Sequence, residues 1–211
     1  MIELYIFVNP LGLESLKAEK EVMRLAEELN TKIHYRFIPI VNLKSIQSRL
    51  KANGKNHLDL QVINEEFTNR YSAALDLKAV LLQGRKIGRR FLMELQEAVQ
   101  LGGRIYSQEL VFEILERLNL DKEAFLAARK SDLVKIAFKQ DQQMVHEMGL
   151  VHLPNAVFFN YESEEDGFII EEPTLLNLHQ YFEDIFHEHL KAYHLNPRNL
   201  NTQANKQLKL V

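Results

Sequence analysis

The chain has 211 residues, 46% of them hydrophobic, a formal net charge of −3 and no cysteine. This size and apolar content allow a large core, in one elaborated domain or two closely joined ones. The lack of cysteine excludes cysteine-liganded zinc and iron–sulfur sites and argues against a disulfide-rich secreted protein. The sequence has no strongly basic character, no apolar run of the ~18 residues that span a membrane and no signal-peptide pattern. We therefore expect a cytoplasmic protein without nucleic-acid or membrane partners.

The N-terminal part of the chain predicts a β-α-β unit. Residues Leu4–Val8 form an apolar run that ends at Asn9-Pro10, as in a strand that is buried on both faces. Beyond this turn, apolar residues recur at i, i+3, i+4 and i+7 and indicate an amphipathic helix that ends near residue 29. A second strand is expected over Lys32–Ile40.

A long helical block is expected next. Apolar residues at helical spacing predict five helices, and Ser107 and Asp121 are suitable N-caps for two of them. The expected helices run over residues 71–82, 91–102, 107–118, from 122 onward, and 132–148. The last of these ends at Gly149.

The strand pattern returns after Pro154. Residues 155–160 and 167–170 predict a hairpin, and apolar residues at helical spacing over 178–189 predict a final helix. The order β-α-β, helical insertion, β-β-α predicts an α/β protein with a thioredoxin-like fold and a helical insertion subdomain. We assign residues 1–42 and 150–192 to the thioredoxin-like domain, 43–149 to the insertion, and 193–211 to a poorly ordered C-terminal tail that is either a frayed end or an interaction arm.

The turn after the first strand carries a family resemblance. Residues 7–15 read FVNPLGLES, and the chain is similar to the DsbA-like branch of the thioredoxin superfamily, specifically to the YjbH/SpxH-like adaptors, whose turn reads FVDPLCPxC. Gly12 and Ser15 occupy the positions of the two cysteines. Further matching segments are Tyr71–Leu75, Leu82–Lys86, Gln96-Glu97, and the Pro154 strand with Phe158–Asn160. The resemblance implies an adaptor that binds the redox-responsive regulator Spx and promotes its degradation by the ClpXP protease.

The broader family label of dithiol–disulfide isomerase does not suit this sequence. A redox-active relative uses a thiolate at the helix N-terminus to attack a disulfide. Gly12 has no side chain, and the hydroxyl of Ser15 can neither form nor resolve a disulfide. We therefore expect a redox-inactive protein with no catalytic residue and no cofactor.

A glutathione-dependent enzyme is the alternative on the same scaffold. Kappa-class glutathione transferases share the DsbA-like fold and hold the glutathione thiolate with a serine at the first of the two positions. That position is Gly12 here, and Ser15 lies one helical turn later, where a capping or first-turn hydroxyl is the simpler interpretation. The neighbouring Glu14 would disfavour a second anion at the helix N-terminus.

The proline before the third strand completes a candidate binding groove. In thioredoxin-like folds a cis proline faces the active turn and exposes backbone groups to an extended peptide, whereas most X-Pro bonds are trans. We predict that Leu153-Pro154 is cis and that an apolar peptide-binding groove remains, without a covalent step. Its expected residues are Pro10, Leu11, Gly12, Leu13, Glu14, Leu153 and Pro154.

Two other clusters are weaker candidates. Arg85, Lys86, Arg89 and Arg90 form a basic patch that could dock an acidic partner or phosphates, or could be a solvated helix face. His187 and His189 are two residues apart and do not share a helix face, so no metal site is expected.

Overall fold

The computed structural model describes residues 2–28, 33–150, 153–160, 168–171, 173, 177–178 and 180–181. The predicted tail at 193–211, residues 161–167 between the two predicted hairpin strands, and most of the expected last helix lie outside the described residues. Residues 178, 180 and 181 of that helix are described and are helical, as is residue 177 just before it.

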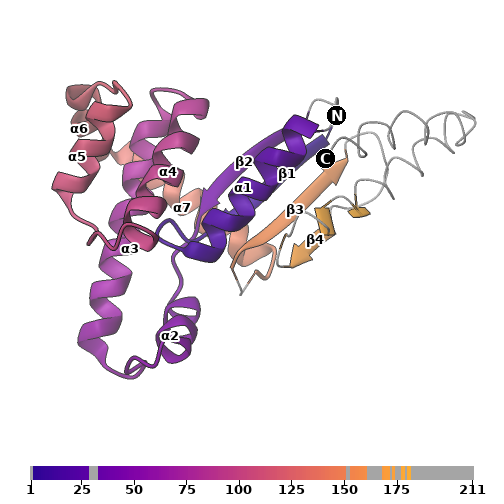
Figure 1. The fold of residues 1–211 in the computed structure, drawn as a ribbon, viewed down its shortest axis with the longest axis horizontal. Coiled ribbons are helices and arrows are strands. Elements are labelled where there is room, and N and C mark those ends of the chain that lie inside the picture. The colour runs from indigo at the N-terminus through magenta and orange to yellow at the C-terminus, as the bar shows by residue number, and fades with distance from the viewer. Residues whose placement is uncertain are drawn as a thin grey trace, which may run out of the picture.

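The sheet has four described strands in the order β2-β1-β3-β4 (Figure 1). They are β1 (Ile2–Val8), β2 (Ile33–Pro39), β3 (Asn155–Asn160) and β4 (Phe168–Glu171). Strands β1 and β2 are parallel and are joined through α1 (Leu13–Glu28), whereas β3 is antiparallel to both β1 and β4. The predicted β-α-β opening and β-hairpin are therefore present, and β2 lies at one edge of the sheet.

Strand β1 is buried on both faces, as its continuous apolar sequence predicts. Leu4, Ile6 and Val8 belong to the main core, which includes residues of α1, α3 and α4. Phe7 points the other way, into a smaller cluster with Ile38 and Val157. Because successive side chains of a strand alternate in direction, one strand contributes to both cores.

Six helices lie between β2 and β3, as the predicted helical insertion requires. They are α2 (Leu43–Ala52), α3 (Leu60–Leu81), α4 (Arg85–Gln100), α5 (Gln108–Arg117), α6 (Lys122–Lys130) and α7 (Asp132–Glu147). In Figure 1, α4, α5 and α6 gather around one end of α3 beside the sheet, while α2 lies next to the other end of α3. Helix α3 is central, because it packs against α2, α4, α6 and α7.

The sequence prediction of this block differs from the structure in three places, one of which is that α4 begins at Arg85 and not at residue 91. Helix α2 was missed because it buries only two apolar side chains, Ile46 and Leu50, which is too few to show a helical period. Helix α3 begins at Leu60 and not at residue 71. The side chain of Asp59 caps this end of the helix by accepting hydrogen bonds from the amides of Gln61 and Val62. Its first turns are mostly exposed and polar and therefore carry a weak apolar pattern.

The predicted caps are confirmed. The Ser107 hydroxyl accepts a hydrogen bond from the Leu110 amide at 3.3 Å, and the Asp121 carboxylate accepts one from the Ala124 amide at 2.9 Å. Helix α7 ends at Glu147, two residues before Gly149, whose φ of +65° lies in the left-handed region that glycine adopts without strain. These local signals fix where the helices begin and end.

Candidate functional site

The turn between β1 and α1 is a tight, buried β-turn over Asn9–Gly12. The Gly12 amide donates to the Asn9 carbonyl at 3.0 Å, and the Leu11 amide donates to the Asn9 side-chain oxygen at 3.1 Å. Asparagine first, proline second and glycine fourth are the residues that such a turn favours. The sequence of this segment therefore specifies its shape without any cysteine.

The two positions that hold cysteines in redox-active relatives are occupied in different ways. Ser15 is buried, and its hydroxyl accepts a hydrogen bond from the Asn9 amide at 2.8 Å, so it is the first-turn hydroxyl that the sequence predicted and ties α1 to the turn. At Gly12 an added Cβ would lie 2.9 Å from Asn9 Cβ and 3.0 Å from Asn9 Nδ2. A side chain at Gly12 would therefore require Asn9 to move.

Helix α4 holds the turn from behind. The Gln96 amide nitrogen donates to the Asn9 carbonyl at 3.1 Å and to the Glu19 carboxyl at 2.8 Å, and the Gln100 amide nitrogen donates to the Leu11 carbonyl at 2.7 Å. Glu19 is fully buried, and this burial raises its pKa to about 8 despite the opposing hydrogen bond from Gln96. At neutral pH the carboxyl group therefore holds its proton and adds no charge beneath the turn.

An open cleft of about 500 Å³ lies beside this turn. The Leu153-Pro154 bond at its side is cis, as predicted. The residues that line the cleft come from the turn and the first turn of α1, from α2 and α3, and from the start of β3 with the two residues before it. They are Asn9, Glu14, Ser15, Ser45, Ser48, Arg49, Ala52, Arg70, Leu153, Pro154 and Asn155.

The expected groove residues are only partly brought together. Glu14, Leu153 and Pro154 line the cleft, but Pro10, Leu11 and Gly12 are buried, and Leu13 is not among the lining residues. Leu11 belongs to the main core instead of forming an apolar rim.

The cleft is also more polar than the predicted apolar groove. The reason is α2, which was missed from the sequence and which contributes Ser45, Ser48 and Arg49 to the lining.

Two guanidinium groups give the cleft its electrostatic character. Arg70 is only 3% exposed and pairs with Glu66 at 3.0 Å, and desolvation lowers the pKa of Arg70. Its Nε atom has no hydrogen-bond partner among the described residues. Arg49 donates to Gln100 at 2.9 Å. Guanidinium groups bind carboxylate and carbonyl oxygens well, so the arginines favour a ligand that offers such oxygens, whereas the Glu14 carboxylate in the same lining opposes negative charge near the start of α1.

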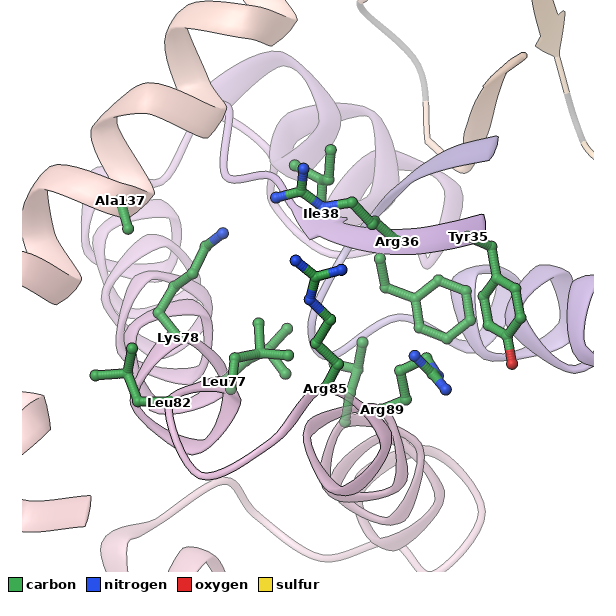
Figure 2. A pocket seen from close by; sticks show the side chains of 12 residues that line it. Tyr35, Arg36, Ile38, Leu77, Lys78, Leu82, Arg85, Arg89 and Ala137 are labelled. Carbon is green, nitrogen blue, oxygen red and sulfur yellow. The ribbon is translucent and has the colours of Figure 1, made fainter. Parts of the chain in front are cut away.

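The basic patch predicted on α4 is divided by the structure. Arg85 and Arg89 line a second pocket, of about 210 Å³, between α4, α3 and β2, whereas Lys86 and Arg90 do not line it. Figure 2 shows the Arg85 guanidinium pointing into this pocket between Lys78 and Arg36. Arg85 and Arg89 therefore lie in a pocket, whereas Lys86 and Arg90, the next residues along the same helix, lie outside it.

Other site types find no support in the part of the chain that the structure describes. No group of three or more histidine or acidic side chains is placed to hold a metal ion. His187 and His189 lie outside the described residues. None of the described helices is long and apolar enough to cross a membrane.

Solved structures with similar folds define the class. A putative protein disulfide isomerase from Nitrosomonas europaea is similar with a TM-score of 0.68 at 14% identity, over 89% of this chain and 98% of that one. DsbA from Pseudomonas aeruginosa is similar at a TM-score of 0.58 and 12% identity, over 91% and 85% of the two chains. 2-Hydroxychromene-2-carboxylate isomerase is similar with a TM-score of 0.59 at 13% identity, over 90% of this chain and 98% of that one. The fold is thus a DsbA-type thioredoxin fold with a helical insertion.

Sequence comparison gives the family. The sequence model described as thioredoxin matches residues 5–181, and the chain belongs to the thioredoxin family. It is similar to the ClpXP adapter protein SpxH of Bacillus subtilis, with 28% identity over 182 residues that cover 79% of this chain and 61% of that protein. The ClpXP adapter protein SpxH of Staphylococcus saprophyticus is 27% identical over 170 residues, 81% of this chain and 60% of that protein. The chain spans about three-fifths of the length of these curated relatives.

Proposed function

We propose that this chain is a redox-inactive, protein-binding adaptor and that a client segment binds without a covalent step in the cleft beside the former dithiol turn. The observation that carries this proposal is the retained cleft in a chain without cysteine: turn, facing Pro154 and opening are all present, but the thiols are not. A cleft of this kind can still contribute shape and hydrogen bonds. Both are sufficient for binding and insufficient for disulfide exchange.

The client that we propose is Spx, and the outcome is its delivery to the ClpXP protease. This part of the proposal is supported by the name of the similar proteins from Bacillus subtilis and Staphylococcus saprophyticus, ClpXP adapter protein SpxH. It is also supported by the fit of the cleft to a polypeptide. Arg49 and Arg70 can bind carboxylates or backbone carbonyls, and the serines of α2 offer further hydrogen bonds.

A calorimetric titration of the protein with Spx tests the proposal. We expect binding by the natural chain and weaker binding by Arg49→Gln, because Arg49 lines the cleft. Lys51→Gln is the matched control: it removes one positive charge from the same helix at an exposed residue outside the cleft, and its affinity should remain that of the natural chain. Absence of any heat of binding to the natural chain would refute the proposal.

A glutathione-dependent enzyme is the second candidate, and the two arginines of the cleft favour it because glutathione carries two carboxylates. The geometry at the reacting position is less suitable. Gly12 offers no hydroxyl, and the Ser15 hydroxyl is buried and already accepts the Asn9 amide. If glutathione binds, millimolar glutathione should raise the melting temperature by mass action. An unchanged melting temperature would remove this candidate.

A further inference from the structure

The second pocket of the molecule lies at the edge of the sheet and is separate from the cleft. We call it the β2 groove: it is bounded by β2, by the C-terminal half of α3 and by the first turns of α4, and four cationic side chains line it (Figure 2). They are Arg36, Lys78, Arg85 and Arg89. Leucine and phenylalanine side chains form much of the remaining wall.

Positive charge exceeds negative charge in the β2 groove. Lys78 forms a buried ion pair with Asp141 of α7, so one of the four cations is neutralised. Arg36 and Arg89 lie over aromatic rings, 5.5 Å from the Tyr5 centroid and 4.7 Å from the Tyr35 centroid. These contacts orient the guanidinium groups. The charge of Arg36 also acts on Asp141, where it lowers the pKa of the carboxyl group against the larger, raising effect of burial, so Arg85 and Arg89 are the cations of the groove without an acidic neighbour among the described residues.

Arg85 is the cation with the fewest contacts. It forms no ion pair, hydrogen bond or ring contact with any described residue, and it is exposed. In Figure 2 its guanidinium group occupies the centre of the β2 groove, near the head groups of Lys78 and Arg36. Cations that converge on a partly apolar pocket favour an anionic occupant, because that occupant relieves their mutual repulsion.

The backbone of β2 supplies a second kind of recognition. The Ile40 amide donates to the Val8 carbonyl of β1, so even-numbered residues of this strand direct their backbone groups toward β1. The odd-numbered residues direct their backbone groups to the outer edge of the sheet. There the Gln142 side chain of α7 donates to the Pro39 carbonyl at 3.0 Å and accepts from the Val41 amide at 3.2 Å.

Two residues of this outer edge remain without such a partner. The outward backbone groups of Tyr35 and Phe37 form no hydrogen bond in the part of the chain that the structure describes. Both residues border the β2 groove. An unpaired strand edge beside a pocket is the arrangement that binds extended peptides by strand addition.

We propose that the β2 groove binds an extended acidic segment of a protein partner. The segment pairs with the outer edge of β2 at Tyr35 and Phe37 and places a carboxylate against Arg85, with Arg36 and Arg89 on either side. The volume of about 210 Å³ suits one or two acidic side chains, while the rest of the segment runs along the strand. This proposal goes beyond the adaptor function and does not depend on the identity of the client or on the cleft.

The test uses a defined probe, a fluorescein-labelled peptide in which glutamate alternates with valine, and measures its anisotropy with the full chain. Arg85→Gln with Arg89→Gln should weaken binding by about tenfold or more, the effect of losing ~1.4 kcal/mol. Lys86→Gln with Arg90→Gln is the matched control, because it removes two charges from the same helix outside the groove. Its affinity should stay within about twofold. If the first double variant does not fold, Arg85→Gln alone gives the same comparison.

Two further peptides separate the proposal from its competitors. The same peptide with glutamine for glutamate should bind weakly, and the glutamate peptide N-methylated at alternate residues should lose binding because it cannot pair with the strand edge. Equal losses in the two double variants, or unchanged binding of the N-methylated peptide, would overturn the proposal. A natural chain that is dimeric in solution and becomes monomeric through Arg85→Gln would also overturn it, because a second copy would then occupy the groove.

Discussion

The buried Glu19 makes the stability of this protein depend on pH in a direction opposite to that of an ordinary salt-bridged carboxylate. Its pKa is about 8 in the folded state and 4.5 as a free side chain. Between these values the folded state retains a proton that the unfolded state has lost, so stability falls as pH rises through this window. Below about 4.5 and above about 8 the contribution of Glu19 is constant.

The magnitude follows from the width of the window. Each pH unit between the two pKa values corresponds to ~1.4 kcal/mol, so between pH 5 and pH 7 this one group lowers the free energy of unfolding by about 3 kcal/mol. Glu19→Gln replaces the carboxyl group by a neutral amide of similar shape and should remove this slope. Part of the pH dependence will remain, because burial also raises the pKa of Asp76 and of Asp141.

Urea unfolding at pH values from 5 to 8 measures the effect. The free energy of unfolding of the natural chain should fall more steeply with pH than that of Glu19→Gln, by ~1.4 kcal/mol per unit. Glu14→Gln, on the exposed side of the same helix, controls for the change of side chain and should retain the natural slope. Parallel curves for the natural chain and Glu19→Gln would refute the argument that Glu19 is buried and protonated.

Two further substitutions test the packing around the two pockets. Lys78→Met leaves Asp141 buried without its paired cation and should lower the free energy of unfolding by about 3 kcal/mol. The double variant Lys78→Met with Asp141→Leu should lower it by less. Equal losses of stability in urea unfolding would contradict the burial of the pair. Gly12→Ala places a methyl group against Asn9 and should cost about 1 to 3 kcal/mol through displacement of the turn. A rise in the melting temperature of Gly12→Ala would contradict the described geometry of the turn.

Local signals explain how much of the fold could be predicted from the sequence. The β-α-β opening, the hairpin and the caps at Ser107 and Asp121 each depend on a few consecutive residues with a clear period or cap. Helix α2 lacks such a period because only Ile46 and Leu50 face the core. The thioredoxin-like class was predicted from the order of the elements, and the family resemblance then agreed with it; neither of them indicated α2.

Only those parts of the candidate site that depend on neighbouring residues in the sequence could be predicted. Ser15 could be recognised as a first-turn hydroxyl, but its bond to the Asn9 amide requires the folded turn. Arg49 and Arg70 were missed because they reach the cleft from helices distant in sequence. Glu19 did offer a signal, a carboxyl group three residues before the buried Val22 on the apolar face of α1, but nothing in the sequence identifies Gln96 as its partner.

The basic patch shows the same limit. Helical geometry separates Arg85 and Arg89 from Lys86 and Arg90, because residues four apart share a face and adjacent residues do not. The sequence does not indicate which pair faces a pocket. That depends on how α4 packs against α3 and β2, which the structure shows (Figure 2).

The most direct test of the proposed function is the rate at which purified ClpXP degrades Spx with and without this protein. An adaptor that presents Spx to the protease should accelerate the loss of Spx, and Arg49→Gln should reduce the acceleration while Lys51→Gln should not. The rate should not depend on added reductant or oxidant acting on this chain, because it has no cysteine. An unchanged rate of Spx degradation at saturating concentrations of this protein would contradict the account.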